Sequence, residues 1–149
     1  MEPVLQQRVP AVPGAIRVLR REAVEAFEAG GGDQALGTDV ALGVTEACAN
    51  AIRHAYPDRA DGHITMRAWF EDGLFVVQVL DRGIGMDAPT ANPGAHLGLA
   101  LLEQLADAQF GLREGGGTEI RLAFRTTGRD GHATGSHEPA AWAVPALSA

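Results

Sequence analysis

Lysine is absent from this sequence of 149 residues, and all 12 basic residues are arginines. A P-loop uses a lysine to reach the phosphates of its nucleotide, and Schiff-base catalysis needs a lysine amine. The sequence therefore excludes both mechanisms. Cysteine occurs only once, as Cys48, which excludes an internal disulfide and a cysteine-based zinc cluster. Its position in the middle of an expected helix predicts a small buried side chain.

Long apolar runs and basic clusters are missing as well. No segment approaches the ~20 apolar residues that a membrane-spanning helix needs, and the first residues do not resemble a signal peptide. The net charge of −7 argues against a nucleic-acid-binding surface, which requires clustered basic residues. With 46% hydrophobic residues, the composition predicts one soluble, cytoplasmic domain that contacts neither a membrane nor nucleic acid directly.

Residues 40–57 form the most informative stretch of the chain. Apolar residues recur there at three- and four-residue spacing, which predicts an amphipathic helix that Thr38 or Asp39 can cap and Pro57 ends. Three polar residues at four-residue spacing share one face of this helix, beside the apolar stripe: Glu46, Asn50 and His54. This row fits either a solvated face or a functional site.

A second polar feature follows the apolar run of residues 74–80, which has the length and β-branched content of a buried strand. Asp81 comes directly after this run, and Gly83 and Gly85 follow. An acid at the end of a strand, with glycines behind it, is typical of a place where the backbone closely approaches a ligand. A dinucleotide-binding fingerprint would also need a third glycine and an immediate helix, and both are missing.

Together these two stretches resemble the ATP site of the gyrase–chaperone–histidine-kinase superfamily, which has the Bergerat fold. Within it, the sequence is most similar to the anti-sigma-factor serine/threonine kinases of bacteria. The resemblance covers roughly residues 9–125. It includes two later segments, which read Gly-Ala-His-Leu-Gly-Leu at residues 94–99 and Gly-Thr-Glu at residues 117–119.

The order of patterns along the chain predicts an α+β fold, in which helices cover a mostly antiparallel mixed sheet as two layers, and the Bergerat fold agrees with it. We expect the ATPase domain at residues 1–125 and a disordered tail at residues 126–149, where the composition follows no pattern. A hairpin turn is expected at residues 71–73. The expected strands are residues 5–12, 63–70, 74–80, 109–113 and 118–124, and the expected helices are residues 13–29, 40–57 and 97–106.

The resemblance implies that the domain binds ATP and Mg²⁺. Asp81 would accept a hydrogen bond from the exocyclic amine of adenine, and Thr118 would support the adenine end. Asn50 would supply an oxygen to Mg²⁺, which prefers oxygen ligands, and Glu46 would be the catalytic base. The residues implied to bind the cofactor are Asn50, Asp81, Gly83, Gly85, Gly94, His96, Leu97, Gly98 and Thr118.

The phosphates are expected at the start of the helix over residues 97–106. Free backbone N–H groups and the helix dipole can bind phosphate there without a lysine. Gly98 can alternatively serve close helix packing. His54 either orients a loop or simply packs.

Two departures from the resembled kinases leave the function open. Residues 86–112 contain no arginine, which those kinases usually carry in this lid, and His96 replaces the first glycine of their Gly-x-Gly. One hypothesis is a serine/threonine kinase that binds a sigma factor, is relieved by an anti-anti-sigma protein, and forms a homodimer through its edge strand. The other is a nucleotide-gated binding module without kinase activity. A metal-dependent hydrolase using residues 46, 50 and 54 is weaker, because they span ~12 Å of helix.

Overall fold

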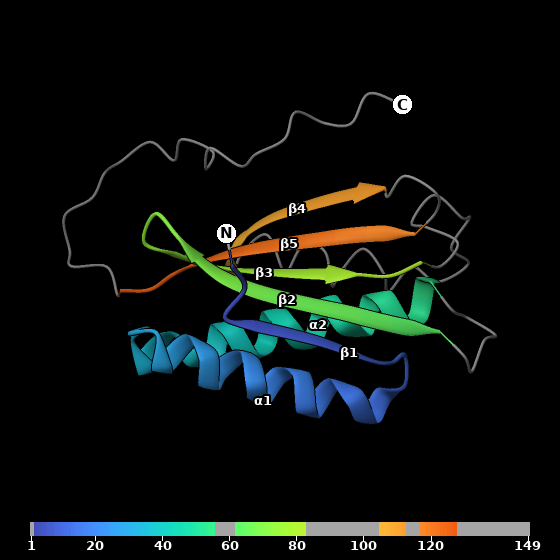
Figure 1. Cartoon of the computed structure of the whole chain (residues 1–149), viewed down its shortest axis with the longest axis horizontal. Coiled ribbons are helices and arrows are strands. Elements are labelled where there is room, and N and C mark those ends of the chain that lie inside the picture. Colours follow the sequence, from blue (N-terminus) through green and yellow to red (C-terminus); the bar gives the residue numbers. More distant parts are fainter. Residues whose placement is uncertain (1, 56–61, 83–104, 113–116, 128–149) are drawn as a thin grey trace.

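The computed structural model describes residues 2–55, 62–82, 105–112 and 117–127. These residues form two layers, with two long helices on one face of a five-stranded sheet (Figure 1). The elements in chain order are β1 (Leu5–Pro10), α1 (Pro13–Ala29), the 3-10 helix η1 (Gln34–Leu36), α2 (Gly37–Ala55), β2 (His63–Glu71), β3 (Leu74–Leu80), β4 (Asp107–Leu112) and β5 (Thr118–Arg125).

The strands follow the order β1-β2-β3-β5-β4, and each of the four pairings between them is antiparallel. This arrangement confirms the predicted α+β fold of helices layered over a sheet. β1 lies at one edge of the sheet, as expected, and Pro10 is its last residue. A proline is tolerated at this position because an edge strand does not need every backbone N–H in the ladder.

The hairpin between β2 and β3 also confirms a sequence prediction. Asp72 and Gly73 have positive φ angles of 50° and 75°. A two-residue hairpin of this type requires positive φ at both central positions, which favours an Asp-Gly pair. The Oγ1 atom of Thr126 donates a hydrogen bond of 2.9 Å to the carbonyl of Gly73, so ordered contacts continue just beyond residue 125. Residues 128–149 of the expected tail lie outside the described residues.

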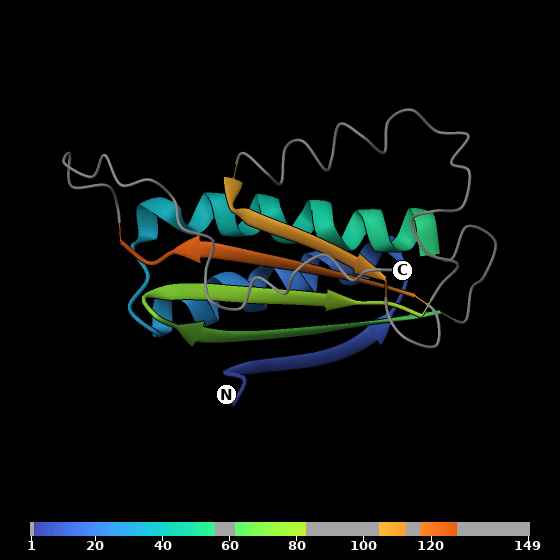
Figure 2. The ribbon, with the colours of Figure 1, turned by 90° about the horizontal axis from the view of Figure 1, so that it is seen from above.

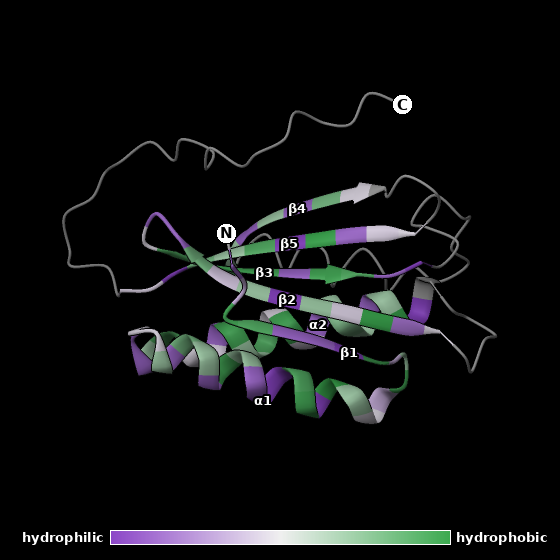
Figure 3. Cartoon of the chain, in the orientation of Figure 1, coloured by the Kyte–Doolittle hydropathy of each residue, from purple (hydrophilic) through white to green (hydrophobic). Residues whose placement is uncertain are grey.

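The core lies between the sheet and the helices. Ile64, Met66 and Ala68 of β2 are buried at alternate positions, whereas the residues between them are at least partly exposed. Figure 3 shows the same alternation of polar and apolar residues along β2, and a mostly apolar β3. Phe27 of α1 contacts Phe75 of β3 with ring centroids 5.4 Å apart. Apolar side chains of α1 and α2 complete this core: Leu19, Ala23, Val40, Val44, Ala47 and Ala51.

The start of the central helix differs from the prediction. α2 begins at Gly37, directly after η1, so Thr38 and Asp39 lie inside its first turn and do not precede it. The side chain of Asp33 caps η1 by accepting a hydrogen bond of 3.0 Å from the N–H of Ala35. Asp39 still favours the start of α2, because a negative charge in the first turn complements the helix dipole.

Several strand boundaries also move slightly, and β2 and β5 each end one residue later than expected. β1 ends at Pro10, two residues earlier than expected, and β4 runs from Asp107 to Leu112 instead of over residues 109–113. Most of the expected helix at residues 97–106 lies outside the described residues. Among the described helices, none combines the length and hydropathy that a membrane crossing requires.

The pKa of the Cys48 thiol can be used to test how completely the core excludes water. Cys48 is fully buried on α2, as predicted, and burial raises the pKa of its thiol from 9.0 to about 12. The unfolded chain then loses the thiol proton at a lower pH than the folded chain does. The free energy of unfolding should therefore fall between about pH 9 and pH 12, by up to ~1.4 kcal/mol per pH unit.

The comparison of wild type with Cys48→Ala isolates this contribution, because all other titrating groups are shared. Urea unfolding between pH 8 and pH 12 should show a shallower loss of stability for the alanine variant. Parallel curves would contradict the burial of a neutral thiol.

Candidate functional site

The candidate site lies at one end of the molecule, where three elements meet. β3 ends there, the antiparallel β5 begins there, and the C-terminal half of α2 reaches the same end in both views (Figures 1 and 2). α2 packs against both strands. Asp81 at the end of β3 contacts Thr118 at the start of β5 there, and Asn50 lies in the C-terminal half of α2.

A pair of hydrogen-bonded side chains closes this end of the sheet. The N–H of Thr118 donates to Oδ1 of Asp81 at 3.2 Å, and the Thr118 hydroxyl donates to Oδ2. The backbone N–H of Asp81 donates in return to the carbonyl of Thr118 at 3.1 Å. Both residues are buried, with exposed fractions of 2% and 4%. The carboxylate plane is therefore fixed before any ligand arrives.

The chemistry of this pair suits recognition of an amine. An ionised carboxylate is an acceptor only, and its two oxygens together offer about four acceptor positions. Asp81 can therefore hold Thr118 and accept a hydrogen bond from a ligand N–H at the same time. The amino group of adenine is such a donor, whereas guanine presents a carbonyl oxygen at the equivalent position. The adenine role that the sequence predicts for these two residues stays a prediction.

Gly117 is a positioning residue to which the sequence analysis assigned no role. Its φ is 98°, and a Cβ built on it would lie 2.0 Å from the carbonyl oxygen of Asp81 and 2.6 Å from the Cα of Arg82. A side chain at this position would push the start of β5 away from the end of β3. The available signal was the glycine directly before Thr118, which the Gly-Thr-Glu segment already contained.

The polar row on α2 is not simply a solvated face. Asn50 is buried, with 5% of its surface exposed, and Glu46 one turn earlier is half-buried. Gly43 brings the helix close to the sheet, because a Cβ there would lie 2.7 Å from Cζ of Phe124 on β5. A buried amide on this helix needs hydrogen-bonding or ligand partners to offset its desolvation. His54 lies in the last turn of α2, and its side chain falls outside the described residues.

The expected phosphate end cannot be placed in the same way. Its residues lie outside the described part of the chain and remain predictions from the sequence: Gly83, Gly85, Gly94, His96, Leu97 and Gly98.

The fold and this polar end define a class of protein, an α+β domain with buried polar residues on one helix and at the adjoining ends of two paired strands. The family described as "Histidine kinase-like ATPase domain" matches residues 9–124, most of the chain. The chain belongs to this family. The match confirms the resemblance inferred from the motifs, at the level of the ATPase family.

Individual relatives narrow the comparison. The chain is 35% identical over 77 residues to the "Serine-protein kinase RsbW" of Bacillus velezensis, which covers 50% of this chain and 48% of that protein. It is 29% identical over 111 residues to RsbW of Bacillus subtilis, covering 72% and 69%. It is also 29% identical over 94 residues to the "Anti-sigma F factor" of Clostridium beijerinckii, covering 55% and 66%.

A solved structure shares the fold. The crystal structure of the RsbU and RsbW domains of Rv1364c from Mycobacterium tuberculosis superimposes with a TM-score of 0.60 at 25% identity. That match covers 84% of this chain but 32% of the other. The chain thus spans about half to two thirds of the related proteins named above, and about a third of this structural neighbour.

Gly117→Ala tests whether close approach of the two strands builds the site. Alanine at a φ of 98° is strained by roughly 1–2 kcal/mol, and the contact with the Asp81 carbonyl should add about 1–3 kcal/mol of destabilisation. Amide hydrogen exchange of Thr118 should also accelerate, because its hydrogen bond to Asp81 is disturbed.

Gly31→Ala is the matched control. Gly31 has nearly the same φ, 96°, but a Cβ added to it would meet no atom within 4 Å beyond its chain neighbours. It should show the backbone strain alone, with Thr118 exchange unchanged. Equal destabilisation of both variants, measured by urea unfolding, would show that Gly117 matters only for its backbone angle.

Proposed function

We propose that the domain binds ATP with Mg²⁺ and phosphorylates a serine or threonine of a protein partner, as an anti-sigma-type kinase that switches between a sigma factor and an anti-anti-sigma protein. The observation that carries the proposal is the buried pair of Asp81 and Thr118, at the same end of the fold as buried Asn50. It is supported by membership of the histidine kinase-like ATPase family. Relatives named as a serine-protein kinase and an anti-sigma factor support the partner class.

The base pocket favours adenine for an electrostatic reason. Asp81 is held as an acceptor by Thr118, so a guanine carbonyl would face it acceptor to acceptor. An unpaired buried contact of this kind costs ~1–3 kcal/mol. Oxygen donors on α2 fit the metal: the amide oxygen of Asn50 is the kind of neutral, hard ligand that Mg²⁺ accepts alongside phosphate oxygens. The bound ion would neutralise charge on the phosphates.

We propose Glu46 as the base that accepts the proton of the partner's hydroxyl. It lies one turn before Asn50, about 6 Å along the helix axis, and it is half-buried. In this proposal its carboxylate accepts the hydroxyl proton as the hydroxyl oxygen bonds to the γ-phosphorus of ATP, and ADP leaves. A positioned base of this type contributes about 10²–10⁴-fold to a rate.

A second function is favoured by one observation. The segment at residues 86–112 has no arginine to stabilise charge on a transferring phosphate. A nucleotide-gated binding module would need Asp81 and Asn50 but would not need Glu46 as a base. Replacement of Glu46 should therefore impair a kinase but leave a nucleotide-gated binding module functional.

Asp81→Asn tests the base pocket. The amide oxygen can still accept from the Thr118 N–H, and the Thr118 hydroxyl can rotate to accept from the new NH₂, so the fold should survive. Wild type should be stabilised by ATP through mass action, by ~2.7 kcal/mol at a hundredfold excess over Kd, and much less by GTP. The preference for ATP should fall by roughly 5- to 150-fold in the variant, which corresponds to ~1–3 kcal/mol.

Thermal unfolding with ATP or GTP at equal concentration is the measurement, and thermal unfolding without nucleotide is the control for folding. Equal stabilisation of wild type by both nucleotides would remove the adenine role of Asp81.

Glu46→Gln and Asn50→Ala separate transfer from binding. Glu46→Gln keeps the shape of the side chain but loses the base, so ATP binding should stay near normal while phosphoryl transfer falls about 10²–10⁴-fold. Asn50→Ala removes the metal oxygen and should weaken Mg²⁺-dependent nucleotide binding. Paired titrations and transfer assays, with and without Mg²⁺, measure both.

The outcomes distinguish the two functions. Glu46→Gln losing ATP binding as severely as Asn50→Ala would make Glu46 a structural residue. Normal Mg²⁺-dependent binding by Asn50→Ala would place the metal elsewhere. Wild type that binds ATP but transfers no phosphate to any partner serine would favour the binding module.

A further inference from the structure

The face of the sheet that points away from the helices carries an ordered row of polar residues. The strand register aligns one residue from each of the five strands in this row, which crosses the whole sheet. Glutamine and arginine alternate along it: Gln6, Arg67, Gln78, Arg121 and Gln109. Neighbouring strands lie ~4.8 Å apart. The row is therefore rich in hydrogen-bond donors and contains no carboxylate.

A groove of about 400 Å³ lies over part of this row. Gln6, Arg67, Gln78 and Arg121 line it, together with Trp69 beside the row. α1 and α2 cover one face of the sheet (Figure 1). The lining residue Arg67 alternates along β2 with residues buried under these helices, so the groove is on the opposite face and is separate from the candidate ATP site. Its proposed role does not depend on the proposed function.

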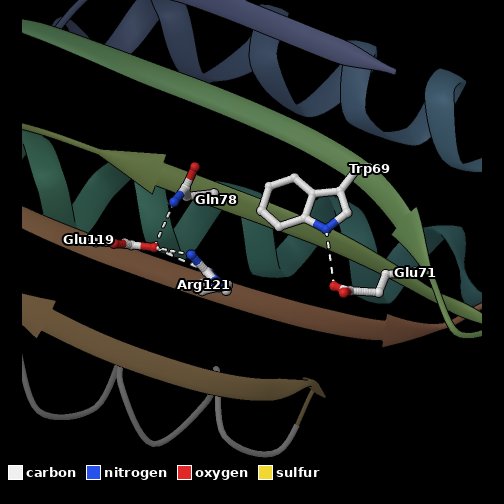
Figure 4. A network of polar contacts seen from close by, with 5 residues as sticks. All are labelled: Trp69, Glu71, Gln78, Glu119 and Arg121. Carbon is white, nitrogen blue, oxygen red and sulfur yellow. Dashed lines mark hydrogen bonds and ion pairs between the residues drawn. The ribbon is translucent and has the colours of Figure 1, made fainter. Parts of the chain in front are cut away.

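Hydrogen bonds hold most of the groove walls in place (Figure 4). The indole N–H of Trp69 donates to Oε2 of Glu71 at 3.3 Å. Arg121 forms an ion pair of 2.8 Å with Glu119, whose Oε1 also accepts from the Gln78 amide at 2.6 Å. The guanidinium of Arg121 lies 5.6 Å from the centre of the Trp69 ring, within the range of a cation–π contact. The indole is thus held by its N–H and by the guanidinium over its ring, and it is partly exposed.

Arg67 differs from these residues. It is exposed at the groove, and its cross-strand neighbours are Gln6 and Gln78, which carry no charge. Of the described residues that line the groove, Glu71 alone is acidic, and its carboxylate already accepts from Trp69. No carboxylate within the described ranges pairs with Arg67. The guanidinium of Arg67 and the indole of Trp69 together suit a ligand that carries a negative charge next to an apolar group.

We propose that this groove binds an extended acidic segment of a partner protein. A carboxylate of the segment pairs with Arg67, and an apolar side chain two residues further along packs on Trp69. The spacing supports an extended segment: Arg67 and Trp69 stand two residues apart on one strand, ~6.6 Å, and side chains two residues apart in an extended peptide have the same separation and direction.

Charge favours a peptide over a nucleic acid in this groove. The chain carries a net charge of −7, so the continuous phosphates of a nucleic acid would be repelled outside the small basic row. A peptide places one or two charges inside the groove and leaves the rest of its surface neutral. Amide groups of Gln6 and Gln78 can bind the peptide backbone at the same time.

The test uses the full chain and two synthetic peptides, Ac-Ser-Glu-Thr-Leu-Ser-NH₂ and the same peptide with glutamine in place of glutamate. The indole N–H signal of Trp69 in ¹H–¹⁵N spectra reports on the groove, and Trp142→Phe assigns it, since the chain has two tryptophans. The glutamate peptide should shift this signal saturably. Arg67→Gln should weaken the apparent affinity about 2- to 5-fold, and the glutamine peptide should bind wild type more weakly by a similar factor.

Two further variants sharpen the result. Gln6→Glu places a carboxylate opposite Arg67 in the register and should compete with the peptide, weakening its binding without any loss of the arginine. Arg21→Gln removes an exposed arginine from α1, on the other layer, and should bind like wild type. The spectra of each variant without peptide verify its fold.

Several outcomes would overturn the proposal. One is an unchanged titration in both Arg67→Gln and Gln6→Glu, and another is equal binding of the two peptides. A single-stranded oligonucleotide that shifts the Trp69 signal at lower concentration than the peptide would assign the groove to nucleic acid. A Trp69 signal that depends on protein concentration without peptide, and loses this dependence in Arg67→Gln, would assign it to a second copy of the chain.

Discussion

The candidate site depends on the contact between the end of β3 and the start of β5. Asp81 and Thr118 are linked there by two side-chain hydrogen bonds and one backbone bond, all buried. Low local dielectric strengthens such bonds, and it also makes an unpaired group at the same place costly. Gly117 allows the two strands to approach closely, because a side chain on it would overlap the backbone of Asp81. The Asp81 carboxylate is therefore part of the framework of the sheet, which explains how it is held in one orientation.

β3 contributes to both the candidate site and the proposed peptide groove. It is the central strand of the sheet, and six of its seven residues are buried. On one face, Val77 and Val79 belong to the core under the helices. On the other face, Gln78 belongs to the polar row and holds Glu119 in place. A substitution in β3 would thus affect both faces, although the candidate ATP site and the proposed acidic-peptide groove use different side chains.

The absence of lysine is compatible with the nucleotide site that we propose in this fold. In the proposed function a carboxylate selects the base and a neutral amide binds the metal, so neither of these two roles requires a lysine. Family membership explains why the domain can be a nucleotide site without a P-loop. The difference between a kinase and a gated binding module is a difference in Glu46 and in the charge around the transferring phosphate. It is not a difference in the fold.

The sequence alone predicted the elements whose patterns are local. The bounds of α1 and β3 agree with the prediction because apolar periodicity and flanking prolines or glycines act within one segment. Asp81, Asn50 and Thr118 could be singled out as candidates because their motifs are also local. The predicted start of the central helix was wrong. The 3-10 helix that Asp33 caps leads directly into α2, which therefore begins before Thr38.

Tertiary structure decided what depends on distant segments. Asp81 and Thr118 are 37 residues apart in the chain, and nothing in either motif states that one would orient the other. The need for glycine at Gly117 arises from the backbone of another strand. The row from Gln6 to Gln109 has no sequence pattern at all, because it is assembled by the register of five strands. Periodicity reports which face of a segment is buried, but only the pairing of strands decides which side chains become neighbours.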